Sequence, residues 1–229
     1  MLIAGSGSAL TAALADEAAR RGIKTALSLI SGQKDERGLS PIAVNEKVVQ
    51  LDWNPCSPIS ARSLVLAAEN RNGPLDTGLI VCAADDTGMR DFSPAGIDFV
   101  VNNHIKSYMF LANELSRHFS ARRSGALAFV LMEGRTPGIL SAPVFSAFKS
   151  FSGAMIAQAN TEYVSALAFS CEGKKPPPVS EYAAYIFKIL GETQKTRQTA
   201  WFKFSKLKMS HTAGLIRILR DGNGGAQPL

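Results

Sequence analysis

A glycine-rich turn near the beginning of the chain is the first feature that could do chemistry. Gly5 and Gly7 follow the apolar residues 2–4 and precede an alanine-rich stretch with a helical pattern. Glycines between a strand and a helix let backbone N–H groups approach a pyrophosphate at the positive end of the helix. Leu10 stands where the G-x-G-x-x-G pattern has its last glycine. The spacing therefore indicates a dinucleotide site, and a tight turn that binds nothing is the alternative.

The three cysteines do not form a metal-binding pattern. Cys56, Cys82 and Cys171 are widely spaced, and no C-x-x-C pair occurs. An odd number of cysteines also argues against a disulfide framework. We therefore expect three buried or half-buried thiols and no metal site.

Alternating strand and helix patterns indicate the fold that would position a dinucleotide site. Short apolar runs typical of buried strands occur at residues 2–4, 24–30, 48–51, 79–84, 126–132 and 164–170. Helical patterns separate them at residues 9–21, 57–70, 98–119 and 143–160, and another follows at 181–190. Such alternation predicts a parallel sheet that is covered by helices on both faces. We predict an α/β fold, a doubly wound parallel (Rossmann-like) sheet in a single domain, with its ligand site at the carboxyl ends of the strands.

The composition is that of a globular domain. The 229 residues are 46% hydrophobic and 19% charged, which supplies a core and too little charge for a disordered chain. The longest apolar run, residues 126–132, is far shorter than the ~20 residues that cross a bilayer, and no signal peptide is visible. We therefore expect a soluble, cytoplasmic protein with no membrane partner.

The order of elements and several local strings resemble the short-chain dehydrogenase/reductase family over residues 1–190. Residues 2–11 resemble the family's T-G-x-x-x-G-x-G turn, with Gly5 at its first glycine position and Ala9 and Thr11 at the other two. Asp52, after the third strand, resembles the aspartate that contacts the adenine ring.

The resemblance extends to the helix that carries the family's catalytic motif. Residues 145–149 resemble the Y-x-x-x-K helix, with Lys149 at the lysine position. The resemblance implies an NAD(P)-binding domain over residues 1–200 and an oxidoreductase function. The cofactor contacts it implies come from Gly5, Ser6, Gly7, Ala9, Asp52, Ala83 and Lys149.

The other catalytic residues of that family are missing or changed. In the family a tyrosine exchanges a proton with the substrate, a serine holds the carbonyl, a lysine supports the tyrosine and binds the nicotinamide ribose, and an asparagine completes a proton relay. Phe145 stands at the tyrosine position and Met132 at the serine position, and neither side chain can transfer a proton. The asparagine position falls at His104, or at Asn103 if the register shifts by one. The catalytic candidates that remain are Lys149 and His104.

Other side chains could replace the missing groups. His104 can act as a general acid near neutral pH, and Tyr108 lies one turn later on the same helical face. Glu133 directly follows the serine position. A rearranged site would combine His104 or Glu133 with Lys149. The alternative is that these side chains serve the structure alone.

Charged residues near the expected cofactor give a weak indication of its type. The second strand ends at residues 29–31 without the carboxylate that NAD-binding proteins usually carry there. Lys34 and Arg37 follow and could meet a 2′-phosphate, which favours NADP over NAD, although a solvated loop is an equal alternative. Asp85 replaces a glycine of the family and would repel phosphate, so the absence of any cofactor is a further alternative.

The positive charge is concentrated near the end of the chain. The net charge is +6, and no acidic residue lies between Trp201 and Arg220. Alternating basic and aromatic residues at 201–208 fit either nucleic-acid binding or an edge strand that carries lysines. We favour the edge strand and do not expect nucleic acid as a partner. Residues 201–229 are predicted as the last strand, a short basic helix and a flexible tail of the same domain.

Three functions follow from these observations. The resemblance implies an NAD(P)-dependent oxidoreductase that is weak, atypical or inactive without the tyrosine and serine. The alternatives are a non-catalytic dinucleotide-binding regulator and an assembly scaffold. The expected partners are a dinucleotide, an unidentified small molecule and a second copy of the chain. The copies would meet through the helices at 98–119 and 143–160, where an apolar stripe fits either a dimer interface or core packing. That stripe comprises Phe148, Phe151 and Met155.

Overall fold

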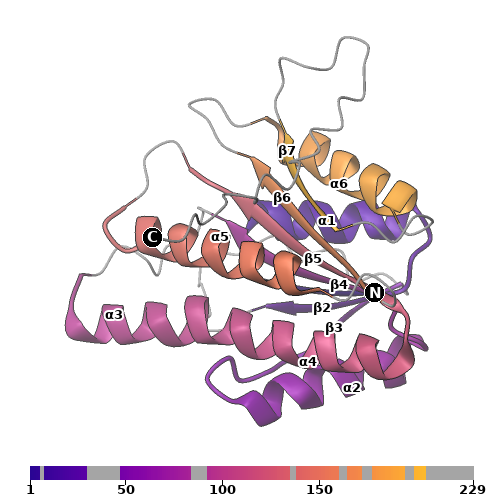
Figure 1. Ribbon diagram of the computed structural model, residues 1–229, viewed down its shortest axis with the longest axis horizontal. Coiled ribbons are helices and arrows are strands. Elements are labelled where there is room, and N and C mark those ends of the chain that lie inside the picture. Colours follow the sequence, from indigo (N-terminus) through magenta and orange to yellow (C-terminus); the bar gives the residue numbers. More distant parts are fainter. Residues whose placement is uncertain are drawn as a thin grey trace, which may run out of the picture.

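A computed structural model describes residues 1–5, 8–29, 47–83, 92–134, 138–159, 164–171, 177–193 and 199–204 (Figure 1). Within these residues the strands form one sheet in the order β3-β2-β1-β4-β5-β6-β7, and every neighbouring pair is parallel. The strands are β1 (Leu2–Gly5), β2 (Thr25–Leu29), β3 (Val48–Gln50), β4 (Thr77–Ala83), β5 (Gly125–Met132), β6 (Val164–Cys171) and β7 (Ala200–Phe204). The helices are α1 (Ala9–Arg20), α2 (Pro58–Asn72), α3 (Pro94–Val100), the π-helical η2 (Val101–Lys106), α4 (Ser107–Arg122), α5 (Ser141–Gln158) and α6 (Val179–Thr193).

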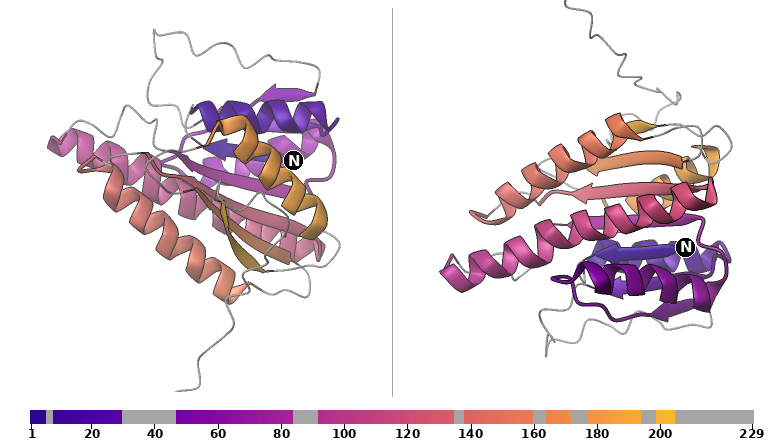
Figure 2. Two further views of the ribbon diagram at one scale, coloured as in Figure 1. Left: turned by 90° about the horizontal axis from the view of Figure 1, so that it is seen from above. Right: turned by 60° about the horizontal axis from the view of Figure 1, so that its bottom comes forward.

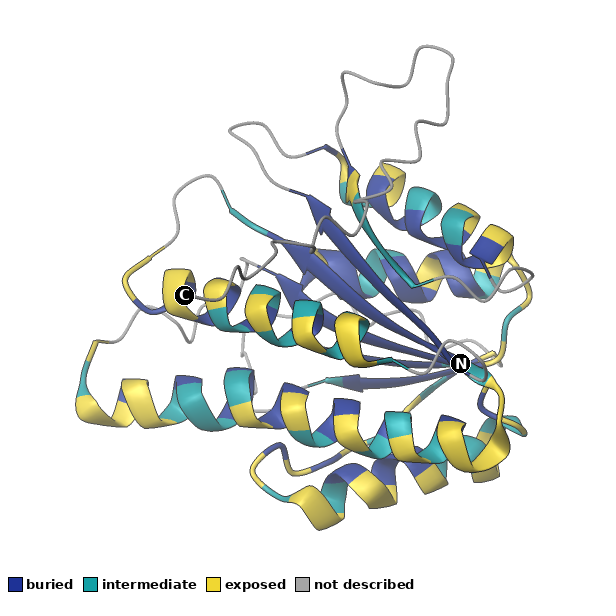
Figure 3. Cartoon of the chain, viewed as in Figure 1, coloured by how far each residue is buried: buried dark blue, intermediate teal, exposed yellow. Residues whose placement is uncertain are grey.

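Helices cover both faces of the sheet. Helices α2, α4 and α5 lie on one face, and α1 and α6 lie on the other (Figures 1 and 2). The buried apolar residues divide accordingly into one cluster under α2, α4 and α5 and a second under α1 and α6. The helices are coloured as buried mainly on the side that faces the sheet and as exposed on the outer side (Figure 3). The predicted doubly wound α/β sheet is therefore confirmed.

The strand order creates a switch point between β1 and β4. From β1 the chain proceeds through β2 to β3 on one side, and it then returns to β4 on the other side of β1. Ligands of such sheets bind in the crevice outside the carboxyl ends of the strands at this point. Gly5 lies level with Val81 of β4, and Ala83 lies level with Met132 of β5. The ends of these three central strands therefore meet at one edge of the sheet.

The long helical run before β5 begins earlier than the apolar periodicity predicts, and it is not uniform. Helix α3 begins at Pro94, and the Ser93 hydroxyl accepts a hydrogen bond from the Gly96 N–H at 3.1 Å. Proline in the first turn after a serine N-cap is a common start of a helix, and this signal precedes residue 98. Between α3 and α4 the backbone follows a π-helix that contains Asn103 and His104.

Strand β7 forms an edge of the described sheet and pairs with β6. The Trp201 Nε1–H donates to the Ser170 Oγ at 3.1 Å, and Phe202 stacks on Phe169 with ring centroids 5.4 Å apart. These aromatic rings are engaged within the protein, which supports the edge-strand interpretation of this segment over a surface that stacks on bases. The short basic helix and the tail predicted after it lie outside the described residues.

Two of the three cysteines are buried as expected, and one is not. Cys82 in β4 and Cys171 in β6 are buried, whereas Cys56 is exposed. Cys56 lies in the turn between β3 and α2, where its backbone N–H donates to the Asn54 Oδ1 at 3.0 Å. No helix in the described part of the chain is long and apolar enough to cross a membrane.

Candidate dinucleotide site at the carboxyl edge of the sheet

The N-terminus of α1 lies at the carboxyl end of β1, where the dinucleotide hypothesis requires it. The Ser8 hydroxyl caps the helix, because it accepts a hydrogen bond from the Thr11 N–H at 3.2 Å. The Ser8 and Thr11 hydroxyls lie 3.0 Å apart and share a second hydrogen bond. No acidic residue lies in the first turn of the helix, so nothing there opposes an anion at its positive end. Thr11, at the family's third glycine position, is thus a buried part of the cap.

Gly5 is required by the neighbouring strand, whatever the site binds. A Cβ atom at this position would lie 2.6 Å from the Val81 carbonyl oxygen and 2.8 Å from the Val81 Cβ. Both of these atoms belong to the β4 strand, which cannot move aside without disturbing the centre of the sheet. The sequence interpretation attributed this glycine to close approach by a cofactor. The structure adds a reason of packing, which sequence spacing could not reveal because it depends on strand register.

Lys149 and Glu133 form an ion pair at this edge. The Lys149 Nζ lies 2.6 Å from the Glu133 Oε1, and their side chains are 35% and 21% exposed. Glu133 directly follows β5, and its backbone N–H donates to the Cys171 carbonyl at 3.1 Å. The ladder between β5 and β6 therefore continues through Glu133 and holds its Cα in place. The structure thus brings together two of the residues that a rearranged site would use.

Met132 and Phe145 occupy opposite faces of the sheet. Met132 packs in the cluster under α1 and α6, whereas Phe145 packs in the cluster under α4 and α5. Successive side chains of a strand point to opposite faces, so the residue after Met132 is the one that faces α5. The contact between Glu133 and Lys149 agrees with this alternation. The structure therefore places Glu133, and not Met132, on the face of the sheet that α5 covers.

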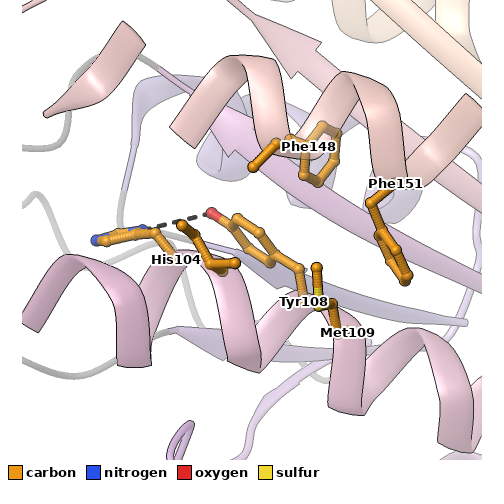
Figure 4. Close-up of a pocket in the computed structure, with 7 residues that line it drawn as sticks. His104, Tyr108, Met109, Phe148 and Phe151 are labelled. Atoms are coloured by element: carbon orange, nitrogen blue, oxygen red, sulfur yellow. Dashed lines mark hydrogen bonds between the residues drawn. The ribbon is translucent and has the colours of Figure 1, made fainter. Parts of the chain in front are cut away.

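His104 and Tyr108 meet in a small apolar pocket between η2, α4 and α5 (Figure 4). The His104 Nδ1 lies 3.5 Å from the Tyr108 hydroxyl, and both side chains are almost fully buried. The Tyr108 ring makes an edge contact with Phe148 of α5, with centroids 5.1 Å apart. Phe148 and Phe151 in turn pack edge-on against Phe129 of β5. These contacts show that both phenylalanines of the predicted stripe pack against the core.

Asn103, the alternative for the family's asparagine position, has its amide engaged within the helical run. Its Nδ2 donates to the Phe99 carbonyl at 2.8 Å, and its own carbonyl accepts a hydrogen bond from the Ser107 hydroxyl. Both bonds stabilise the π-helical segment. Residue patterns carry no signal for such a segment, so the sequence did not predict it.

The remaining predicted cofactor contacts are only partly described. Asp52 is exposed beyond the end of β3, Ala83 is buried at the end of β4, and Ala9 is exposed in the first turn of α1. Five residues lie outside the described part of the chain, and they are Ser6, Gly7, Lys34, Arg37 and Asp85.

The described residues fit a nicotinamide dinucleotide at this edge. The helix end without acidic residues suits a pyrophosphate, and the small residues Gly5 and Ala83 end the two strands at the switch point. The exposed carboxylate of Asp52 is available to a ligand beyond β3. Lys149 supplies a partly exposed cation beside β5.

Comparison with solved structures assigns the fold to a class. The structure is similar to levodione reductase, with a TM-score of 0.69 at 14% identity over 89% of this chain and 95% of that one. It is similar to a short-chain dehydrogenase from Mycobacterium smegmatis, with a TM-score of 0.67 at 16% identity over 89% and 91%. A Brucella melitensis 3-ketoacyl-(acyl-carrier-protein) reductase complexed with NADH matches with a TM-score of 0.67 at 12% identity over 88% and 94%. The chain therefore has the fold of short-chain dehydrogenases/reductases.

The sequence on its own matches neither a protein-family model nor a curated protein. At these low identities the structural likeness establishes the fold, and the activity must be argued from the site.

Proposed function

We propose that the protein is a divergent member of the short-chain dehydrogenase/reductase family that binds a nicotinamide dinucleotide and lacks the family's tyrosine-dependent carbonyl chemistry. The observation that carries this proposal is the set of residues at the carboxyl edge of the sheet. The binding features Gly5, the α1 N-terminus and Lys149 are present, whereas Phe145 and Met132 stand at the positions that the sequence resemblance gives to the tyrosine and serine, and Glu133 beside Met132 faces Lys149. One solved structure of this fold is a complex with NADH, which supports a dinucleotide as the ligand.

Each binding residue has a role that its chemistry allows. The N–H groups at the start of α1 would hold the pyrophosphate, and Asp52 would meet the adenosine end beyond β3. Lys149 would donate to the nicotinamide ribose. When bound, the cofactor supplies or accepts a hydride. Phe145 can neither donate nor accept the proton that carbonyl reduction also needs, so the site binds without that step. A regulator that reports dinucleotide binding is thus favoured over an oxidoreductase.

Saturable binding of NADH or NADPH is the expected result of a titration followed by tryptophan fluorescence. Trp53 directly follows Asp52, so it reports on the end of the site beyond β3. Lys149→Met is expected to weaken binding about tenfold or more, because a hydrogen bond from a charged group contributes about 1.5–3 kcal/mol.

The matched control for this titration is Lys188→Met, which removes an exposed lysine from α6 and should leave affinity unchanged. Comparing NADH with NADPH also tests the preference for NADP that Lys34 and Arg37 suggest. Absence of binding by the wild-type protein up to millimolar dinucleotide would contradict the proposed function and favour a scaffold.

We also propose that two copies of the chain associate through α4 and α5. The exposed positions of α5 carry no charge, which is unusual for a helix that faces water. These exposed positions are Ala142, Pro143, Ser146, Ser150, Ala154, Ala157 and Gln158. On the neighbouring helix Met109 is 40% exposed.

Light scattering after size-exclusion chromatography is expected to give twice the mass of the 24.5 kDa chain. Ala154→Glu would place a charge at the interface and is expected to yield the single-chain mass. A wild-type protein that elutes as a single chain at micromolar concentration would argue against this interface.

A further inference from the structure

The ion pair between Glu133 and Lys149 has a consequence for ligand binding. Glu133 stands at the carboxyl end of β5, which lies beside β4, and β4 lies beside β1 at the switch point. Its carboxylate therefore adds negative charge to the edge at which an anionic dinucleotide would bind. It also holds the ammonium that would contact the ribose. We infer that Glu133 is a built-in competitor that opposes dinucleotide binding by occupying Lys149, an inference that rests on the proposed function.

The geometry of the pair makes such competition effective. The Nζ and Oε1 atoms are 2.6 Å apart, so the ammonium and the carboxylate are in direct charge-assisted hydrogen-bond contact. The Glu133 backbone is held by its hydrogen bond to the Cys171 carbonyl, so the carboxylate starts from a fixed strand end. The Lys149 backbone is held in α5, directly after Phe148 and one turn after Phe145, which are both buried. Because both anchors are rigid, the two side chains meet without rearrangement of the backbone.

The exposure of the pair allows the contact to open. The Lys149 and Glu133 side chains are 35% and 21% exposed, so water screens their attraction. A ligand that brings its own acceptors to the ammonium can therefore share or displace the carboxylate. Each binding event then includes the cost of weakening this contact and of placing phosphate charge near a carboxylate.

The substitution Glu133→Gln removes the charge that competes for Lys149 and leaves the backbone at position 133 in place. Glutamine keeps the shape of the side chain and removes its charge. We expect this variant to bind NADH about 5- to 30-fold more tightly than wild type, the range that corresponds to losing one charge-assisted contact. The matched control is Glu114→Gln, which removes a carboxylate from the ion pair with Arg117 on α4, where the separation is 3.2 Å. The control variant is expected to bind NADH as wild type does.

A second measurement tests the pair without any dinucleotide. An ammonium held against a carboxylate is a poor nucleophile, because the proton it must lose is hydrogen-bonded. Acetic anhydride should therefore label Lys149 faster in Glu133→Gln than in wild type and Glu114→Gln, as measured by peptide mass spectrometry. Equal labelling rates would overturn the inference at its first step, whatever the dinucleotide does.

The two measurements distinguish failure of this inference from failure of the proposed function. Faster labelling together with tighter NADH binding supports the competitor. Binding of NADH by Glu133→Gln, with none detectable in wild type, supports the competitor but contradicts the proposed dinucleotide binding by the wild-type protein. Faster labelling with unchanged or weaker NADH binding overturns the inference and makes Glu133 a positioning residue. If neither protein binds NADH, the proposed function and the competitor are both contradicted, although the pair itself exists.

Discussion

Wild-type protein is expected to reduce aldehydes and ketones at least about 10²–10⁴-fold more slowly than a tyrosine-containing reductase of the same fold, the factor that a positioned acid–base group contributes. The physical reason is that Phe145 is buried and has no proton to give. The measurement is the loss of NADH or NADPH absorbance with a panel of carbonyl compounds. Levodione reductase, a structure with the same fold, would serve as the positive control in the same assay.

Turnover at a rate comparable to the control would contradict this expectation. Two variants would then identify the residues that carry out the reaction. If His104→Ala abolished turnover, the pair of His104 and Tyr108 would supply the proton, and their contact at 3.5 Å would be the reactive one. If Glu133→Gln abolished it instead, the ion pair with Lys149 would be the catalytic unit.

Gly5→Ala is expected to lower the free energy of unfolding by about 3 kcal/mol, at the upper end of what overpacking costs. The added Cβ would lie 2.6 Å from the Val81 carbonyl oxygen and 2.8 Å from the Val81 Cβ. Relief would require β1 and β4 to move apart at the centre of the sheet. Chemical denaturation followed by circular dichroism measures this change.

Gly191→Ala is the matched control for that substitution. Nothing lies within 4 Å of a Cβ at Gly191, which is part of α6. Replacing a helical glycine by alanine removes backbone freedom from the unfolded chain, so its expected effect is stabilisation by up to about 1 kcal/mol. Unfolding of Gly5→Ala at the same denaturant concentration as wild type would contradict the close approach of β1 to β4. Ligand binding would then be the remaining explanation for a glycine at position 5.

The fold was predictable because its signals are local. Buried parallel strands appear as short apolar runs, and in this chain each such run became a strand of the sheet. The start of α3 also has a local signal, because Ser93 and Pro94 form a helix cap. The prediction began at residue 98 because it relied on apolar periodicity. The π-helical segment could not be predicted from the sequence, because it arises from the register of backbone hydrogen bonds and not from residue type.

The candidate site was only partly predictable, because its contacts depend on which face a side chain takes. Counting along the chain from Phe145 put Met132 at the serine position. In the structure the alternation of β5 turns Met132 to the opposite face and presents Glu133 to α5. The side chain that faces α5 at this strand end is therefore a carboxylate, and it pairs with Lys149.

The residues at this edge differ in how far packing alone explains them. Gly5 and the capped end of α1 depend on strand and helix packing, so selection on stability alone would retain them. Lys149 is different, because a partly exposed lysine contributes little to stability. Its pairing with Glu133 is the feature that a purely structural interpretation explains least well.

The structure of a crystal soaked with NADH tests the central claim most directly. The proposed function predicts dinucleotide density along the carboxyl ends of β1, β4 and β5, with the pyrophosphate at the first turn of α1. The nicotinamide ribose is predicted beside Lys149, with the Glu133 carboxylate displaced from its present 2.6 Å contact. A dinucleotide bound elsewhere on the molecule, or no density at a concentration well above the affinity measured in solution, would contradict it.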